Sequence, residues 1–206
     1  MSKGALSWID YCQDDTDGVP ALTGNGGTSA LSFDASYPGA NALTDQPSEV
    51  AQVDYTRNTT ADTDITVTCT FSASNDKTMR VLALLNVRLP SNVVQVTAQA
   101  KNAAGTVLET GTTYTAAQLV LIPGQTDRYN LFWILTADRV GASAAFNFRF
   151  PISTSGYFEI GRAWAGLLPD AAFVSPHAPN PCGQAPVGRE WFPLTFRDPN
   201  ERWLGV

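Results

Sequence analysis

Short segments in which apolar and polar residues alternate recur along much of this chain. The clearest lies between Ile65 and Phe71, where every second residue is apolar and threonines occupy the intervening positions. Because successive side chains of a strand point to opposite faces, this pattern predicts a strand that buries one face. The same reasoning predicts strands over residues 50–55, 94–100 and 144–150. A helical period of useful length is hard to find.

Two segments are apolar almost without interruption. Met79–Leu89 is rich in large aliphatic residues and is bounded by Pro90. Its length and its neighbours predict a central strand buried on both faces, with a helix as the alternative. Tyr129–Leu135 predicts a second fully apolar strand. Between these two segments, the turn residues at 104–105 predict a hairpin over residues 92–110.

The stretch from Gly156 to Gly166 changes its alternation at Gly161. Before this glycine the apolar residues stand at even-numbered positions (Phe158 and Ile160), and after it at odd-numbered positions (Ala163 and Ala165). An extra residue or a close backbone approach at Gly161 would explain the change. We expect this stretch to be the last major strand of the domain, with Glu159 and Arg162 serving the scaffold rather than chemistry.

Eight or more short strands separated by turns predict an all-β fold, an antiparallel β-sandwich or jelly roll, over residues 1–166. Residues 4–12 are apolar enough for a short strand anchored by Trp8. The turn-rich region from Gln13 to Pro47 is predicted to be loop. Its aspartates between residues 14 and 17 lack the distal glutamate of a calcium loop, so turn chemistry explains them better.

Composition changes after Gly166. Residues 167–199 contain seven prolines, which are incompatible with a continued central sheet, and aromatic residues atypical of a disordered tail. We expect residues 167–206 to form an extended arm that packs on its own domain or on a neighbouring subunit. Aromatic and arginine side chains carry much of the energy of protein interfaces. The candidate interface residues are therefore Trp191, Phe192, Phe196, Arg197, Arg202 and Trp203.

Charge and hydropathy exclude several classes of partner. Hydrophobic residues make up 44% of the 206 residues and charged residues only 16%, which suits packing against other proteins. The net charge of −6 and the scattered basic residues argue against nucleic acid. No run of about 18 apolar residues could span a membrane as a helix. Residues 1–20 lack the pattern of a signal peptide, so we expect synthesis in the cytoplasm.

The three cysteines are widely spaced and form no CxxC pair. Their odd number supports neither a disulfide framework nor a zinc site. Cys69 lies in the alternating strand and is predicted to be a small buried hydrophobe. A bridge between Cys12 and Cys182 stays open as an alternative.

Several motifs together resemble a known family. They are the run Asn41–Val50, the apolar segment containing Ala83–Asn86, the turn Ala104–Gly111, and Ser155–Arg162 followed by Ala165-Gly166. In this order they resemble tailed-bacteriophage virion proteins built on a galactose-binding-like, discoidin-type jelly roll. The resemblance covers roughly residues 40–170 and implies a setting in the virion, in the tail or its tip. The group often has a histidine where this chain has Val87, which leaves any role of that imidazole without support.

Candidate catalytic chemistry is sparse. His177 is the only histidine, it lies between prolines, and neither a triad nor a histidine-based metal site can be built around it. No pair of carboxylates is singled out as glycosidase machinery. A glycan site on loops at one end of the sandwich would use Trp8, Tyr37 and Asn41, although Trp8 also suits the core or its rim.

We therefore expect a non-enzymatic structural component of a phage tail, tail tip or baseplate, which binds other virion proteins and copies of itself. It needs no cofactor or metal. The alternative is a receptor-recognition module of the particle that binds a host surface glycan. In both hypotheses the protein is synthesised in the host cytoplasm and ends in the virion.

Overall fold

The chain is described by a computed structural model. It describes residues 10–12, 20–24, 31–44, 48–56, 60–71, 77–152, 155–167, 196–197 and 203–204. Side chains of the strand residues 20–24, 196–197 and 203–204 are not included in the description. Within these residues, strands form two main sheets, and every strand pair is antiparallel.

The first sheet, sheet A, is built around β4 and β10. Its strand order is β1-β4-β10-β6-β7, and β8 pairs with β6. Phe148 of β10 lies opposite Ile65 of β4 and Val96 of β6, so the same parity of all three strands faces inward. The strands are β1 (Pro20–Gly24), β4 (Thr63–Thr70), β6 (Gln95–Lys101), β7 (Val107–Thr110), β8 (Tyr114–Thr115) and β10 (Ser143–Phe150).

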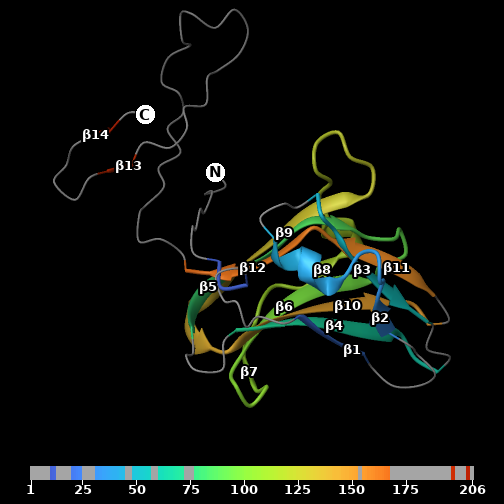
Figure 1. Cartoon of the computed structure of the whole chain (residues 1–206), viewed down its shortest axis with the longest axis horizontal. Helices are drawn as coiled ribbons and strands as arrows, with labels where there is room; N and C mark the ends of the chain where they lie inside the picture. Colours follow the sequence, from blue (N-terminus) through green and yellow to red (C-terminus); the bar gives the residue numbers. More distant parts are fainter. Residues whose placement is uncertain are drawn as a thin grey trace, which may run out of the picture. The chain divides into compact units, whose positions relative to one another are not determined.

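The second sheet, sheet B, is built around β5. Its order is β12-β5-β11-β3-β2, and β9 pairs with the other edge of β5. Figure 1 shows the two sheets as two layers, one over the other. The strands are β2 (Leu31–Phe33), β3 (Ala51–Tyr55), β5 (Lys77–Arg88), β9 (Arg128–Gly141), β11 (Gly156–Ile160) and β12 (Arg162–Gly166). Two short 3₁₀ helices, η1 (Gly39–Leu43) and η2 (Ala116–Gln118), lie in connections.

The core lies between the sheets and is rich in aromatic rings. Each buried large apolar side chain stabilises the fold by about 1.5–3 kcal/mol relative to exposure. Pairs of aromatic rings, one from each sheet, join the two layers. They bury apolar area and also fix how one sheet packs on the other. The centroid distances are 4.3 Å for Phe148–Phe158, 4.5 Å for Tyr55–Phe150 and 5.9 Å for Trp133–Phe146.

The predicted antiparallel β-sandwich is confirmed. The alternating segments form β3, β4, β6 and β10, and the predicted hairpin is the β6–β7 pair. The segment predicted as a strand buried on both faces is β5, where four successive residues from Val81 to Leu84 are at most 5% exposed. The helical alternative for this segment is wrong.

The change of parity at Gly161 is also confirmed. Phe158 and Ile160 of β11 and Ala163 and Ala165 of β12 are all fully buried, although the intervening Gly161 shifts their spacing. The break lets one continuous segment pair with β3 and then with β5. The stretch thus joins β3 to β5 within sheet B.

One expectation about the N-terminal part of the chain is wrong. The region predicted to be loop before Pro47 contains β1 and β2, which pair with β4 and β3. β1 begins at Pro20 and ends at Gly24, and β2 is only three residues long, so neither carries much strand signal and their partners supply the order. The strand predicted over Tyr129–Leu135 is confirmed as part of β9, and one of its faces is open to solvent, since Phe132 and Ile134 are 50% and 53% exposed. Of residues 4–12, the described Asp10–Cys12 form a turn, and the rest lie outside the described residues.

In the C-terminal region the structure describes one pair of short strands, β13 (Phe196–Arg197) and β14 (Trp203–Leu204). The boundary expected at Gly166 coincides with the end of β12, and the division of the chain there stays a prediction. Across the described ranges, no helix is both long and apolar enough to cross a membrane.

Candidate ligand-binding face

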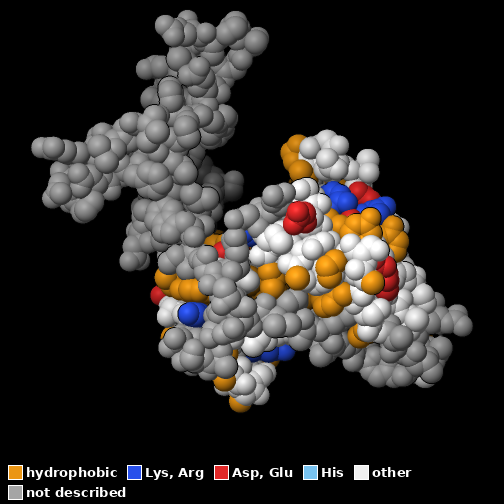
Figure 2. All heavy atoms as spheres, in the orientation of Figure 1, with side chains coloured by type: hydrophobic (Ala, Val, Ile, Leu, Met, Phe, Trp, Pro, Cys, Tyr) orange, Lys and Arg blue, Asp and Glu red, His pale blue; other side chains and the backbone are white. Residues whose placement is uncertain are grey.

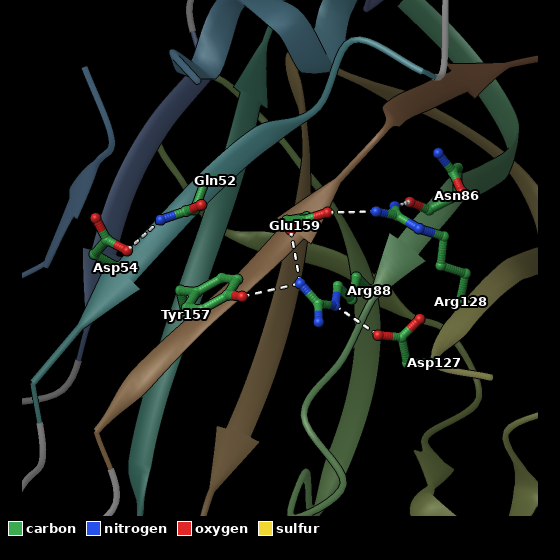
Figure 3. A network of polar contacts seen from close by, with 8 residues as sticks. All are labelled: Gln52, Asp54, Asn86, Arg88, Asp127, Arg128, Tyr157 and Glu159. Carbon is green, nitrogen blue, oxygen red and sulfur yellow. Dashed lines mark hydrogen bonds and ion pairs between the residues drawn. The ribbon is translucent and has the colours of Figure 1, made fainter. Parts of the chain in front are cut away.

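The outward face of sheet B carries a group of polar side chains at one end of the sheet. Its central strands present them because their alternate residues, such as Val53 and Phe158, are buried in the core. Glu159 lies opposite Gln52 on one side and Arg88 on the other. Figure 3 shows the group, which we call the polar face: Gln52, Asp54, Asn86, Arg88, Asp127, Arg128, Tyr157 and Glu159.

Glu159 is the centre of this polar face. It is only 8% exposed and accepts hydrogen bonds from two arginines. Arg128 Nη2 donates to its Oε2 at 2.6 Å, and Arg88 Nη1 donates to its Oε1 at 3.2 Å. Arg88 Nε donates in turn to Asp127 Oδ2 at 2.6 Å. Acids and arginines therefore alternate in one chain of ion pairs, visible as dashed lines in Figure 3.

A bulge in β5 brings the arginines together. The register between β5 and β9 shifts between Leu84 and Val87, and Asn86 adopts a φ of 53°. Asparagine tolerates this left-handed conformation better than most residues. The Asn86 carbonyl accepts a hydrogen bond from Arg128 Nη1 at 3.2 Å, and its N–H donates to Asn130 Oδ1 at 2.9 Å. The bulge thus holds Arg128 against Glu159.

Tyr157 is the exposed aromatic residue of the polar face. The residue is 42% exposed, and its hydroxyl accepts a hydrogen bond from Arg88 Nη1 at 2.9 Å. The Arg88 guanidinium lies 5.5 Å from the centroid of the ring. A cation at this distance from a ring is attracted to its π face. The ring is therefore held in place while much of it faces solvent.

Asp54 and Gln52 extend the polar face along β3. Asp54 lies directly opposite Tyr157 in the strand register, so the two side chains are neighbours on one face. Gln52 Nε2 donates to Asp54 Oδ1 at 2.8 Å. Both side chains are partly exposed and leave polar atoms beside the ring.

The charges of the polar face are fixed by their partners. Hydrogen bonds from Arg88 to Asp127, and then to Glu159, raise the pKa of the guanidinium further above its ordinary value. Arg88 and Asp127 are each somewhat more than a third exposed, so solvent screens their attraction. Figure 2 shows basic and acidic side chains touching near the loop that leads into β9.

This arrangement suits recognition better than catalysis. Glu159 is enclosed by two guanidinium groups, so it positions the arginines instead of facing a ligand. The solvent-facing groups are an aromatic ring, carboxylates, an amide and a guanidinium. In the part of the chain that the structure describes, no cluster of three or more acidic, histidine or cysteine side chains could hold a metal ion.

The residues expected to bind a ligand fall partly on described positions. Tyr37 is 47% exposed, and its carbonyl accepts a hydrogen bond from the Gln52 N–H at 2.9 Å, which places its backbone beside β3. Asn41 lies in η1 and donates from Nδ2 to the Val50 carbonyl at 3.0 Å, a structural contact. Trp8 lies outside the described residues, so the predicted trio stays a prediction.

The expected interface residues lie in the C-terminal region. Trp191, Phe192 and Arg202 are outside the described residues. Phe196 and Arg197 form β13, and Trp203 begins β14, opposite Arg197. Their role at an interface stays a prediction.

Sequence reasoning missed Arg88, Asp127 and Tyr157. Tyr157 carried a usable signal, because its parity in the stretch beginning at Gly156 is opposite to that of the apolar Phe158 and Ile160. No sequence signal pointed to Arg88 and Asp127, because they are far apart in sequence and meet only through the pairing of β5 with β9.

No family model and no curated protein sequence matches the chain. Among solved structures, chitosan-binding module 1 from a chitosanase/glucanase of Paenibacillus sp. IK-5 has 12% identity and a TM-score of 0.48, covering 76% of this chain and 98% of that one. A fucose-binding module of Streptococcus pneumoniae has 7% identity and a TM-score of 0.47, with 81% and 98% covered. The module CBM32-3 from a family 31 glycoside hydrolase of Clostridium perfringens has 9% identity and a TM-score of 0.45, with 69% and 90% covered. At such low identities and TM-scores, we transfer neither ligand nor function from them.

Proposed function

We propose that this protein is a non-catalytic carbohydrate-binding module and that the polar face of sheet B binds the sugar. One observation carries the proposal. The half-exposed ring of Tyr157 lies on a rigid strand, and Arg88, Asp54 and Asp127 are fixed around it by hydrogen bonds. This combination of an apolar surface with a few oriented polar groups is what small-ligand sites share.

A sugar ring has both kinds of surface that the polar face offers. Its axial C–H groups form an apolar patch that can lie on the Tyr157 ring. Its hydroxyls can donate to the carboxylates of Asp54 and Asp127 and accept from Arg88. Because ion pairs and hydrogen bonds hold these groups before any ligand arrives, little side-chain entropy is lost on binding.

The ligand is expected to be a neutral sugar. The four charges of the ion-pair chain alternate in sign, so neither sign dominates around Arg88 and Glu159. A strongly anionic glycan would have to displace Asp127 from Arg88, and a cationic one would compete with Arg88 for the face of Tyr157.

A panel of immobilised neutral, amino and acidic oligosaccharides tests the proposal directly. The wild-type chain should bind at least one neutral member, and Tyr157→Ala should weaken that binding by about fivefold or more, since an aromatic contact is worth about 1 kcal/mol or more. Arg88→Lys keeps the charge but loses the fork of donors, so it should also weaken binding.

Phe132→Ala is the matched control. It removes a ring of similar exposure, on β9 of the same sheet but outside the polar face. Binding should be unchanged in this variant. Failure of the folded wild-type chain to bind any sugar of the panel, or equal binding by Tyr157→Ala and wild type, would contradict the proposal.

A second candidate function is assembly with copies of itself, the role expected of a virion component. It is favoured by the exposed apolar residues of β9, where Phe132, Ile134 and Val140 are each at least half exposed. Burying such side chains against another protein would be favourable. The virion setting itself, in a tail or tail tip, stays a prediction from the sequence resemblance.

Light scattering after gel filtration tests this second function. We expect the wild-type chain to self-associate and the double variant Phe132→Ser/Ile134→Ser to shift towards the monomer. Tyr157→Ala should leave the distribution unchanged, because its residue lies in the polar face. A wild-type chain that is monomeric at all accessible concentrations would exclude self-assembly.

A further inference from the structure

The segment Asp10–Cys12 is fastened to the free edge of β12. Asp10 is 4% exposed, and its Oδ2 accepts hydrogen bonds from Arg162 Nε at 3.0 Å and Nη2 at 2.8 Å. Its Oδ1 accepts from the N–H groups of Cys12 and Ala165, and Tyr11 N–H donates to the Ala165 carbonyl at 2.8 Å. These bonds fix the backbone that carries Cys12.

The same segment reaches across to sheet A. Cys12 and Cys69 are each 1% exposed in the core, and Cys69 lies close enough to raise the pKa of the Cys12 thiol. Cys69 belongs to β4 and points inward beside Ala144 of β10. One residue earlier, the ring of Tyr11 lies 5.9 Å from that of Phe71. The two thiols therefore meet where the segment bridges the two layers.

We propose that Cys12 and Cys69 are an oxidisable thiol pair that a small-molecule disulfide converts into an intramolecular disulfide. Both cysteines are free in this structure, and both lie in the core where the segment Asp10–Cys12 passes between the two layers. A thiolate of one cysteine attacks the small disulfide and releases one small thiol. The second cysteine then attacks the mixed disulfide, forms the Cys12–Cys69 bond and releases the second small thiol. Two electrons and two protons pass from the protein to the oxidant.

The surroundings make the reduced pair slow to react. The neighbouring Cys69 thiol and burial raise the pKa of the Cys12 thiol, the charge of Asp10 adds to this, and Arg162 opposes it. Little thiolate is therefore present in the closed structure. Exchange should require transient opening of Asp10–Cys12. Once formed, the disulfide would tie β4 of sheet A to the segment that holds β12 of sheet B.

Refolding the wild-type chain in a mixture of oxidised and reduced glutathione tests this inference. Tryptic mapping without reduction should find the peptide of residues 4–57 joined to that of residues 58–77. The oxidised chain should melt about 5–15 °C above the reduced one, as expected for a disulfide that closes a long loop. Cys182→Ser should behave like wild type.

Cys69→Ala is the matched loss variant, since it removes one small buried thiol and little volume. It should show neither the cross-linked peptide nor the rise in melting temperature. A bridge from Cys12 to Cys182, persistent glutathione adducts, or no cross-link after refolding would overturn the inference, and so would a linked chain that is less stable than the reduced one.

Discussion

One buried tyrosine, Tyr55, makes the stability of this sandwich depend on alkaline pH. Tyr55 is 4% exposed and stacks on Phe150, and burial raises its pKa to about 12 from the ordinary 10.0. The folded state therefore holds this proton more tightly than the unfolded state. This difference in proton affinity adds about 2–3 kcal/mol to the free energy of unfolding. The contribution is fully present below pH 10 and is lost as the pH rises towards 12.

Denaturant unfolding at a series of alkaline pH values measures this effect. The wild-type chain should lose stability between about pH 10 and 12, and Tyr55→Phe should lose visibly less over the same interval. The phenylalanine keeps the stacking but has no proton to lose. Identical slopes for the two proteins would show that Tyr55 does not set the response.

Glu159 is predicted to be a structural residue of the polar face. Glu159→Gln leaves the guanidinium groups of Arg88 and Arg128 without their shared carboxylate at a site whose side chain is 11% exposed. We expect a loss of about 1–3 kcal/mol in the free energy of unfolding. Asp127→Asn is the control, because the Asp127 side chain is 38% exposed and its pair should be worth less than about 1 kcal/mol. Equal losses in both variants would refute this ranking.

At the scale of elements, the outer edge of β9 is covered by the segment that follows β7. Trp133 Nε1 donates to the Thr112 carbonyl at 2.7 Å, and the Tyr114 hydroxyl donates to the Phe132 carbonyl at 2.6 Å. Covering an edge in this way protects its unpaired backbone groups from other chains. Gly111 allows the close approach, because a Cβ there would lie 2.7 Å from the Trp133 ring.

Gly111→Ala should therefore destabilise the protein by about 1–3 kcal/mol, because the buried indole must move to make room. Gly156→Ala, in β11, is the matched control, since the added Cβ would lie 3.4 Å from the nearest atom of Tyr55 and should change stability little. Thermal unfolding of both variants gives the comparison. A Gly111→Ala protein as stable as wild type would mean that the segment does not pack on Trp133 as described.

The strands differ in how far the sequence predicts them. In β4 the apolar positions, including Ile65 and Cys69, alternate without exception, and the segment is a strand. β5 is predicted by its aliphatic run, which only a strand buried on both faces explains between other strands. β1 and β2 escaped prediction because their order comes from hydrogen bonds to β4 and β3, which no local pattern records.

At the scale of the whole molecule, the polar face depends on contacts that the sequence does not reveal. Arg88, Asp127 and Glu159 come from separate strands and a turn, and they meet because β5 pairs with both β9 and β11. The outward orientation of Tyr157 could have been predicted from its position in the alternating pattern. Its hydrogen bond with Arg88 could not. The sequence did predict that Glu159 and Arg162 would serve the scaffold, and their side chains, 11% and 14% exposed, are each held in ion pairs.

The most direct measurement is an amide NMR titration of the folded chain with the neutral sugar that binds best in the panel. The account predicts saturable shifts clustered at residues 52–54, 86–88, 127–128 and 157–159, which saturate only at higher sugar concentration in Tyr157→Ala and are unchanged in Phe132→Ala. Shifts confined to β9, to sheet A or to the region of Tyr37 and Asn41 would contradict the assignment of the sugar site to the polar face.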